Sequence, residues 1–264
     1  MKYAIITVLA AAVCLILGIA VVSRFTKKHR VLKGSLFGAL LLILIGLGYL
    51  MIYHHAQDQA IAALNGSELV RVEKLDKGYH FDGPGDDAAL IFYPGAKVEA
   101  EAYAPLLLHL AEEGMDTFLV RMPMRIAFLD PNAAGSIMNE FSYEHWLLAG
   151  HSLGGAVAAS YASAHPDDLD GLVLLAAYPT KQLETPLLSI YGSEDGCLER
   201  NVYDKDRIYW PETSIEVIIE GGNHAQFGDY GKQKGDKEAR ISAEEQWEQA
   251  VMAVIAFRDT HIRN

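Results

Sequence analysis

Residues 145–155 read HWLLAGHSLGG, and this stretch decides the architecture expected for the chain. A short apolar run ends at Gly150, Ser152 follows, and the helical run LGGAVAASYASAH begins directly after it. The order of strand, serine and helix predicts a tight turn that holds the serine in a strained backbone conformation. Gly150 and Gly154 flank the serine, where larger side chains would collide across the turn. We therefore predict that Ser152 is a nucleophile, raised above the end of a strand at the positive end of a helix.

Short apolar runs alternate with helical runs on either side of this turn. The strand-like runs are 69–75, 79–81, 88–93, 117–120, 145–150, 171–176, 187–191 and 214–219. The helix-like runs are 100–113, 132–139, 153–165 and 242–257, the last opening with the capping-box spacing SAEE. This alternation predicts an α/β fold, with a mostly parallel central sheet and helices on both faces. Residues 178–186, which join two strand-like runs, are too few to form a lid domain.

A serine hydroxyl needs a base to take its proton and an acid to orient that base. On such a scaffold the acid and then the histidine follow in loops after later strands. The sequence GSEDG follows the run 187–191, and we predict Asp195 as the acid, with Glu194 as the competing choice. The sequence EGGNHAQFG follows the run 214–219 and carries His224 after two glycines, so His224 is the predicted base.

Two backbone N–H groups should stabilise the negative charge that develops on the substrate oxygen. The turn itself offers the N–H of Leu153. The loop PGAK, after the run 88–93, offers the N–H of Ala96, with Gly95 permitting the turn. Cys197 could be considered as another nucleophile, but it lacks a comparable strand–turn–helix setting. This chemistry needs no metal and no organic cofactor.

Charge separates the chain into two parts. Residues 1–53 contain six Lys or Arg and no acidic residue, whereas residues 54–264 contain 16 basic and 34 acidic residues, a formal charge of −18. Such an acidic body argues against nucleic acid as a partner, because phosphate binding needs clustered Lys and Arg. The only cysteines, Cys14 and Cys197, can form neither a disulfide framework nor a zinc site by themselves.

Two uncharged apolar runs, 3–22 and 35–53, are each long enough to cross a bilayer. Because the intervening segment SRFTKKHRVLK is strongly basic, the positive-inside rule places it in the cytoplasm. The sequence thus predicts a cell-membrane protein with two spans in residues 1–53, a linker over 54–67 and an extracytoplasmic domain over 68–264. If the first run were instead a cleaved signal peptide, the second would leave the domain in the cytoplasm.

The segments GHSLGG, YGSEDG and GGNHAQFG, preceded by FYPGAKVEAEAYAPL, occur in this order along the chain. Over about residues 68–258 the chain resembles the alpha/beta-hydrolase superfamily. It is most similar to compact bacterial members whose first loop reads Tyr-Pro-Gly, with Pro94 in place of the more frequent histidine. The resemblance implies a triad of Ser152, Asp195 and His224, with the amides of Leu153 and Ala96 as the oxyanion hole.

The expected activity is that of a serine hydrolase of the carboxylesterase type, which cleaves an acyl bond through an acyl-enzyme. The substrate would be a small-molecule or cell-surface acyl compound, most simply an ester. Two alternatives remain at the level of sequence. The same triad could transfer the acyl group to a cell-surface acceptor, or the fold could serve as a non-catalytic binding protein.

Overall fold

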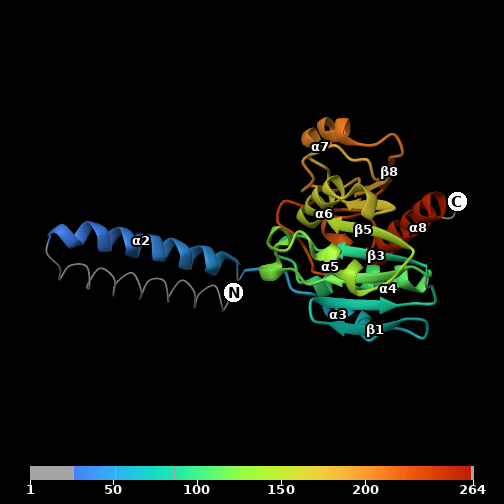
Figure 1. Cartoon of the computed structure of the whole chain (residues 1–264), viewed down its shortest axis with the longest axis horizontal. Helices are drawn as coiled ribbons and strands as arrows, with labels where there is room; N and C mark the ends of the chain where they lie inside the picture. Colours follow the sequence, from blue (N-terminus) through green and yellow to red (C-terminus); the bar gives the residue numbers. More distant parts are fainter. Residues whose placement is uncertain (1–26, 51, 86, 263–264) are drawn as a thin grey trace. The chain divides into compact units, whose positions relative to one another are not determined.

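The computed structural model describes residues 27–50, 52–85 and 87–262. The chain divides into two compact units, residues 1–53 and 54–264. In the first unit, helix α2 (Lys27–Leu50) begins inside the segment that we predicted as a basic loop (Figure 1). Across the described part of the chain, no helix is both long enough and apolar enough to cross a membrane. The predicted span 35–53 is therefore not supported, and the predicted span 3–22 lies outside the described residues.

An eight-stranded sheet organises the second unit. Its strands are β1 (Arg71–Leu75), β2 (Gly78–Asp82), β3 (Ala88–Tyr93), β4 (Asp116–Val120), β5 (His145–His151), β6 (Gly171–Leu175), β7 (Leu187–Gly192) and β8 (Ile215–Ile219). They are arranged in the order β1-β2-β4-β3-β5-β6-β7-β8. The six strands from β4 to β8 are parallel, while β2 runs antiparallel to both β1 and β4. The predicted α/β fold with a mostly parallel sheet is confirmed.

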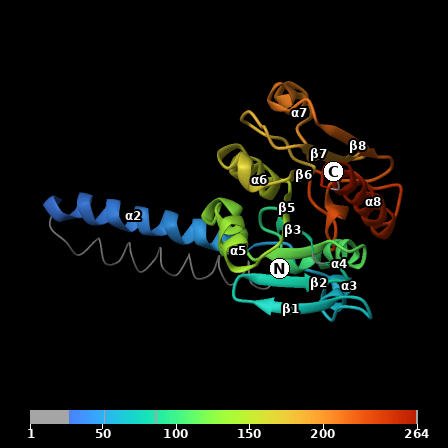
Figure 2. The ribbon, with the colours of Figure 1, turned by 45° about the vertical axis from the view of Figure 1, so that its right-hand side comes forward.

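Helices cover both faces of this sheet, and the central strands are therefore buried on both sides. In β3, Leu90 and Phe92 pack into one apolar core and Ile91 into the other. The first core is shared with α3 (Asp58–Ala63), α4 (Ala104–Glu112) and α8 (Ala243–His261). The second core is shared with α5 (Ala133–Glu140) and α6 (Leu153–Ala164) (Figure 2). The remaining helix, α7 (Arg200–Asp206), follows β7.

The stretch 54–67, which the sequence suggested as a linker, belongs to the globular unit and contains α3. Ala60 of α3 is fully buried, and its backbone N–H donates to the Asp229 carboxylate at 2.9 Å. The segment before α3 is bound as well, since the N–H of His54 donates to the carbonyl of Lys97 at 2.7 Å. These partners lie far away in the sequence, so the local polar composition could not reveal that the segment packs on the body.

The connection from β6 to β7 is short, and residues 176–186 contain neither helix nor strand. No lid domain is inserted at this point, as predicted. The loops that follow β3, β5, β7 and β8 therefore meet at the carboxyl edge of the sheet without a covering domain between them. Catalytic residues of open α/β sheets gather at this edge.

Candidate active site

Ser152 lies in the turn between β5 and α6 and has the strained backbone that the sequence predicted. Its φ is 52° and its ψ is −121°, a conformation that residues other than glycine rarely adopt. The turn is held because the Ser152 N–H donates to the carbonyl of Leu175 at 2.9 Å, while the Ser152 carbonyl accepts from Ala156 in the first turn of α6. The side chain of Ser152 is half-buried and thus partly open to solvent.

The two glycines of the turn are needed for close backbone packing. A Cβ at Gly150 would lie 2.6 Å from the carbonyl carbon of Gly154. A Cβ at Gly154 would lie 2.1 Å from the carbonyl oxygen of Tyr93 and 2.3 Å from that of Pro94. The start of α6 is therefore pressed against the end of β3, which brings the Leu153 amide close to the loop that carries Ala96.

Asp195 and His224 form a hydrogen-bonded pair, contributed by the loops after β7 and β8. Asp195 Oδ2 lies 2.9 Å from His224 Nδ1, and both side chains are almost completely buried. The loops are also joined through their backbones, since the N–H of Glu194 donates to the carbonyl of Gly222 at 2.8 Å. Because the carboxylate faces Nδ1, this nitrogen carries the imidazole proton and Nε2 is the basic atom.

The Asp195 carboxylate is fixed by its own loop. Its Oδ1 accepts from the N–H groups of Cys197 (2.8 Å) and Leu198 (2.7 Å), which leaves Oδ2 for the histidine. Glu194, the competing choice for the acid, instead forms an ion pair with Arg240 at 2.6 Å. The carboxylate that orients His224 is thus that of Asp195.

The structure brings His224 next to the serine turn without joining the two side chains. The His224 ring lies 4.5 Å, between centroids, from the ring of His151, the residue before Ser152. Within the described part of the chain, the Ser152 hydroxyl makes no hydrogen bond, including none to His224. Catalytic hydrogen bonds of this kind are often long in the absence of substrate and shorten in the reacting complex.

The amides proposed for the oxyanion hole are open to a ligand. Neither the N–H of Leu153 nor that of Ala96 has a hydrogen-bond acceptor among the described residues. The N–H groups on either side of Ala96 are occupied, since that of Gly95 donates to Tyr103 Oη and that of Lys97 to the carbonyl of Arg125. Of the three N–H groups at residues 95–97, that of Ala96 is thus the one left to donate to a ligand.

Cys197 is placed near the acid but is unsuited to act as a nucleophile. Burial raises the pKa of its thiol, and the neighbouring Asp236 carboxylate raises it further. The thiolate is the reactive form of cysteine, so a raised pKa makes the side chain less reactive. Its Sγ accepts a hydrogen bond from Gln233 at 3.3 Å, as a packed loop residue would.

A model of the alpha/beta hydrolase family matches residues 89–248, more than half of the chain. The matched region begins in β3 and contains the serine turn and the Asp195–His224 pair. The chain belongs to the alpha/beta hydrolase family. No curated protein sequence matches it.

Solved structures share the fold of this alpha/beta hydrolase at low sequence identity. An esterase of M. tuberculosis is 14% identical, with a TM-score of 0.55 over 76% of this chain and 96% of its own. Est1E from Butyrivibrio proteoclasticus is 15% identical, with a TM-score of 0.55 over 75% and 100% of the two chains. Mouse alpha/beta hydrolase domain-containing protein 10 is 13% identical, with a TM-score of 0.52 over 72% and 98%. At these identities the likeness concerns the fold alone.

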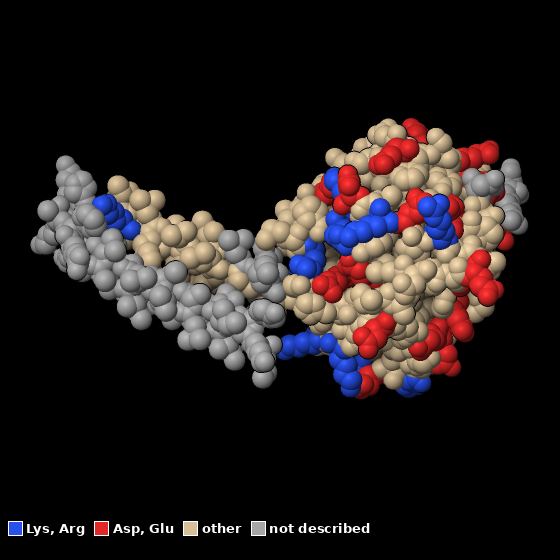
Figure 3. All heavy atoms as spheres, turned by 90° about the horizontal axis from the view of Figure 1, so that it is seen from below, with Lys and Arg blue, Asp and Glu red and all other residues tan. Residues whose placement is uncertain are grey.

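A cavity of about 550 Å³ lies beside the loop after β4 in this alpha/beta hydrolase. Its lining includes Lys77, Glu101, Arg121 and Asp130, but not Ser152. The charges are paired across the cavity wall, Arg121 with Glu101 at 2.5 Å and Lys77 with Asp130 at 2.8 Å. Basic and acidic side chains also lie side by side on the face of the hydrolase drawn in Figure 3. The cavity therefore presents balanced rather than basic charge.

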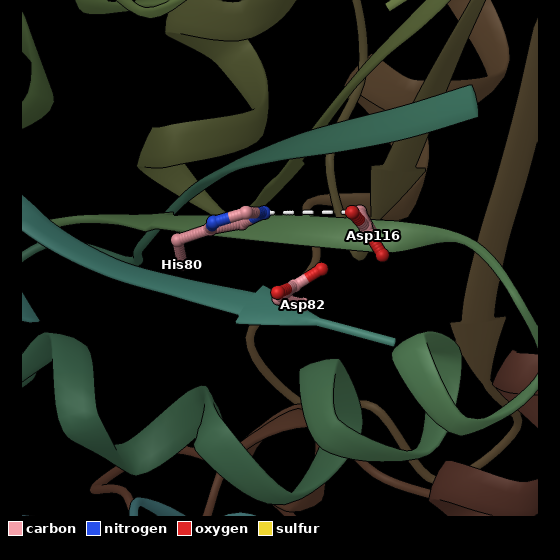
Figure 4. Close-up of side chains that lie close together, drawn as sticks. All are labelled: His80, Asp82 and Asp116. Carbon is pink, nitrogen blue, oxygen red and sulfur yellow. Dashed lines mark ion pairs between the residues drawn. The ribbon is translucent and has the colours of Figure 1, made fainter. Parts of the chain in front are cut away.

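A second group of polar side chains lies at the opposite edge of the sheet. Figure 4 shows His80 and Asp82 from β2 beside Asp116, the first residue of β4. Their ligand atoms are close enough together to hold a metal ion, but those of His80 and Asp116 already bond to protein groups. Asp116 accepts from Tyr143 Oη at 2.5 Å and from the N–H of Gly83 at 2.8 Å, while His80 Nε2 lies 3.1 Å from Tyr143 Oη. The two buried side chains of this cluster, His80 and Asp116, thus have protein partners.

Proposed function

We propose that this alpha/beta hydrolase is a serine hydrolase that cleaves an acyl bond, with a carboxylic ester as its substrate. The observation that carries most weight is the 2.9 Å hydrogen bond between Asp195 and His224 beside the strained serine turn. That bond orients the imidazole and stabilises the imidazolium that forms when His224 takes a proton. The family membership of the chain supports the same class of reaction.

In the first half of the reaction, Ser152 Oγ attacks the carbonyl carbon of the ester while its proton passes to His224 Nε2. The carbonyl oxygen becomes an oxyanion, which the N–H groups of Leu153 and Ala96 stabilise. When the tetrahedral intermediate collapses, the bond to the alcohol breaks and His224 returns the proton to the leaving oxygen. The acyl group is then bound covalently to Ser152.

In the second half, water replaces the alcohol. His224 takes a proton from water, the resulting hydroxide attacks the acyl-enzyme, and the proton is returned to Ser152 Oγ as the acid leaves. The half-buried Ser152 and the short 176–186 connection support access for water and for substrates of different sizes. Each stabilising N–H is expected to contribute a factor on the order of 10²–10³ to the rate.

Covalent labelling with a fluorophosphonate probe tests the proposal, because such probes react only with activated serines. The wild-type protein should be labelled and the Ser152→Ala variant should not. Ser163→Ala, a change on the same helix in a serine whose hydroxyl donates to the carbonyl of Gln182, is the matched control and should label like wild type. Undiminished labelling of Ser152→Ala would refute the assignment.

The bond type is tested by hydrolysis of p-nitrophenyl esters of increasing acyl length, compared with the corresponding anilides. An esterase should release p-nitrophenol in a Ser152-dependent manner and should cleave the anilides far more slowly. If only the anilides were cleaved, the proposed substrate class would be wrong. If the acyl group passed to an added alcohol in preference to water, the reaction would be acyl transfer.

A further inference from the structure

Tyr103 and His151 form a buried pair between the loop after β3 and the serine turn. Tyr103 ends the short helix η1 (Ala100–Tyr103), and His151 is the last residue of β5. Tyr103 is fully buried and His151 is 1% exposed. Tyr103 Oη lies 2.8 Å from His151 Nδ1 and accepts a hydrogen bond from the N–H of Gly95 at 3.1 Å. The pair thus connects the loop that carries Ala96 to the residue that precedes Ser152.

The hydrogen bonds of this pair favour one direction, from Tyr103 to His151. The N–H of Gly95 can only donate, so Tyr103 Oη accepts from it, and His151 Nδ1 is the partner within reach of the phenolic proton among the described residues. With Nδ1 as the acceptor, the proton of the neutral imidazole lies on Nε2, a buried atom that has no hydrogen-bond partner among the described residues. Burial lowers the pKa of His151 well below its ordinary value, with a further contribution from His224, and the ring stays neutral. A neutral ring is what the acceptor role requires.

The Tyr103–His151 pair also restricts the position of the loop that carries Ala96. A Cβ on Gly95 would come within 2.8 Å of Tyr103 Oη and 3.0 Å of His151 Nδ1, so the loop backbone is packed directly on both polar atoms. On its other side, the His151 ring contacts His224, with centroids 4.5 Å apart, and Phe227, at 5.6 Å. A single buried pair therefore touches the Ala96 loop, the serine turn and the loop of the base.

We propose that Tyr103 and His151 are positioning residues, which hold the Ala96 N–H at a fixed place relative to Ser152 through the chain of bonds Gly95 N–H to Tyr103 Oη to His151 Nδ1. The proposal rests on the proposed serine hydrolase activity. Oxyanion stabilisation depends on donors that are already in place when the charge develops. A displacement of about 1 Å in a reacting group can reduce the rate on the order of 10²-fold.

Tyr103→Phe removes the hydroxyl and leaves the ring in place. We expect kcat and kcat/KM for a p-nitrophenyl ester to fall together, by about 10- to 100-fold, because the lost alignment matters only in the transition state. KM should change by no more than about twofold. A variant with unchanged kcat would overturn the proposal.

Two substitutions of His151 separate positioning from packing. The side-chain oxygen of asparagine is the same number of bonds from Cα as Nδ1, whereas that of glutamine matches Nε2. His151→Asn can thus still accept from Tyr103, and we expect its kcat to stay within about fivefold of wild type. His151→Gln, which is closer to histidine in volume, should lose activity as Tyr103→Phe does. If the glutamine variant were the more active of the two, packing and not the hydrogen bond would explain the pair.

A spectroscopic measurement tests the proposed tautomer without reference to activity. ¹⁵N NMR of the imidazole nitrogens in the intact protein should show His151 with Nδ1 unprotonated and Nε2 protonated. Protonation at Nδ1 would overturn the proposal even if the activities followed expectation. If labelling depends on Ser152 but Tyr103→Phe and both His151 variants retain full kcat, the inference fails alone. If labelling does not depend on Ser152, the proposed function fails and the inference fails with it.

Discussion

His224 is held from several directions by residues of different loops. Asp195 binds its Nδ1, the His151 ring lies beside it, and the N–H of the following residue, Ala225, donates to the Asp236 carboxylate at 2.8 Å. A base fixed in this way loses little orientational freedom when the reaction begins. The orientation of the imidazole should therefore respond most strongly to the loss of the Asp195 carboxylate.

Asp195→Asn should lower kcat by a factor on the order of 10³–10⁴, because an amide in place of the carboxylate favours the wrong tautomer of the histidine. The measurement is steady-state hydrolysis of a p-nitrophenyl ester. Glu194→Gln is the matched control: it removes the neighbouring carboxylate, which pairs with Arg240, and should leave kcat within about twofold. A larger loss for Glu194→Gln than for Asp195→Asn would reverse the assignment of the acid.

The buried His151 should make stability depend on pH. Its pKa is lowered in the folded protein, so the unfolded chain binds more protons once the pH falls below the ordinary value of 6.5. Stability from this residue is therefore present above pH 6.5 and lost on acidification, by at most about 1.4 kcal/mol per pH unit. Urea unfolding at pH 7.5 and 5.5 should show a smaller acid loss for His151→Asn than for wild type. Equal losses would contradict the lowered pKa.

The candidate site residues could be predicted where the neighbouring sequence carries a clear signal. Ser152, Asp195 and His224 each follow a strand-like run and lie beside glycines, so a short window reveals each of them. Tyr103 has no such signal, because its partner His151 lies 48 residues away and the contact exists only once β3 and β5 are paired. Because the contact depends on the pairing of β3 with β5, the sequence alone could not predict that Tyr103 and His151 form a pair.

The helices and strands that could be predicted from the sequence are those that their own residues are sufficient to specify. The buried parallel strands read as continuous apolar runs, and α8 begins at Ser242 with both hydrogen bonds of the predicted capping box. The short helices α3 and α7 were missed. A helix of six or seven residues is not stable by itself and depends on tertiary contacts, such as the bond from Ala60 to Asp229.

Ser242→Ala removes the side chain that accepts from the N–H of Glu245 at 3.2 Å. We expect the free energy of unfolding to fall by about 1 kcal/mol, as for other N-cap serines. Ser136→Ala, an exposed position in α5, is the control and should change it by no more than about 0.5 kcal/mol. Urea denaturation measures both. Equal effects of the two changes would show that the cap does not stabilise α8 measurably.

In the whole molecule, the compact hydrolase unit begins at residue 54 and includes α3. A protein of residues 54–264 should match the full chain in fluorophosphonate labelling, since these residues form a compact unit. A protein of residues 68–264 lacks α3 and leaves the Asp229 carboxylate without the Ala60 N–H. Its free energy of unfolding should be lower by about 1–3 kcal/mol or more. Equal stability of the two proteins would restore the linker interpretation of residues 54–67.

The membrane location of residues 1–53 stays a prediction, supported by the two apolar runs in the sequence and not by a spanning helix in the described residues. Carbonate extraction of cells that express the full chain tests it. The full chain should remain in the membrane pellet, and the 54–264 protein should not. Protease digestion of intact cells then tests the predicted extracytoplasmic position of the hydrolase unit, which full protection would contradict.

The entry of the chain into the hydrolase unit has a mechanical consequence. The backbone of His54 bonds to Lys97, next to Ala96, and that of Gln57 donates to the carbonyl of Asp229, five residues beyond His224. Residues 54–56 also bond to Glu99, so a tensile load applied at residue 53 would act first on the bonds to Lys97, Glu99 and Asp229, and so on the loops that carry the oxyanion donor and the base. Pulling on the chain before residue 54 should therefore lower the catalytic rate at forces too small to unfold the sheet.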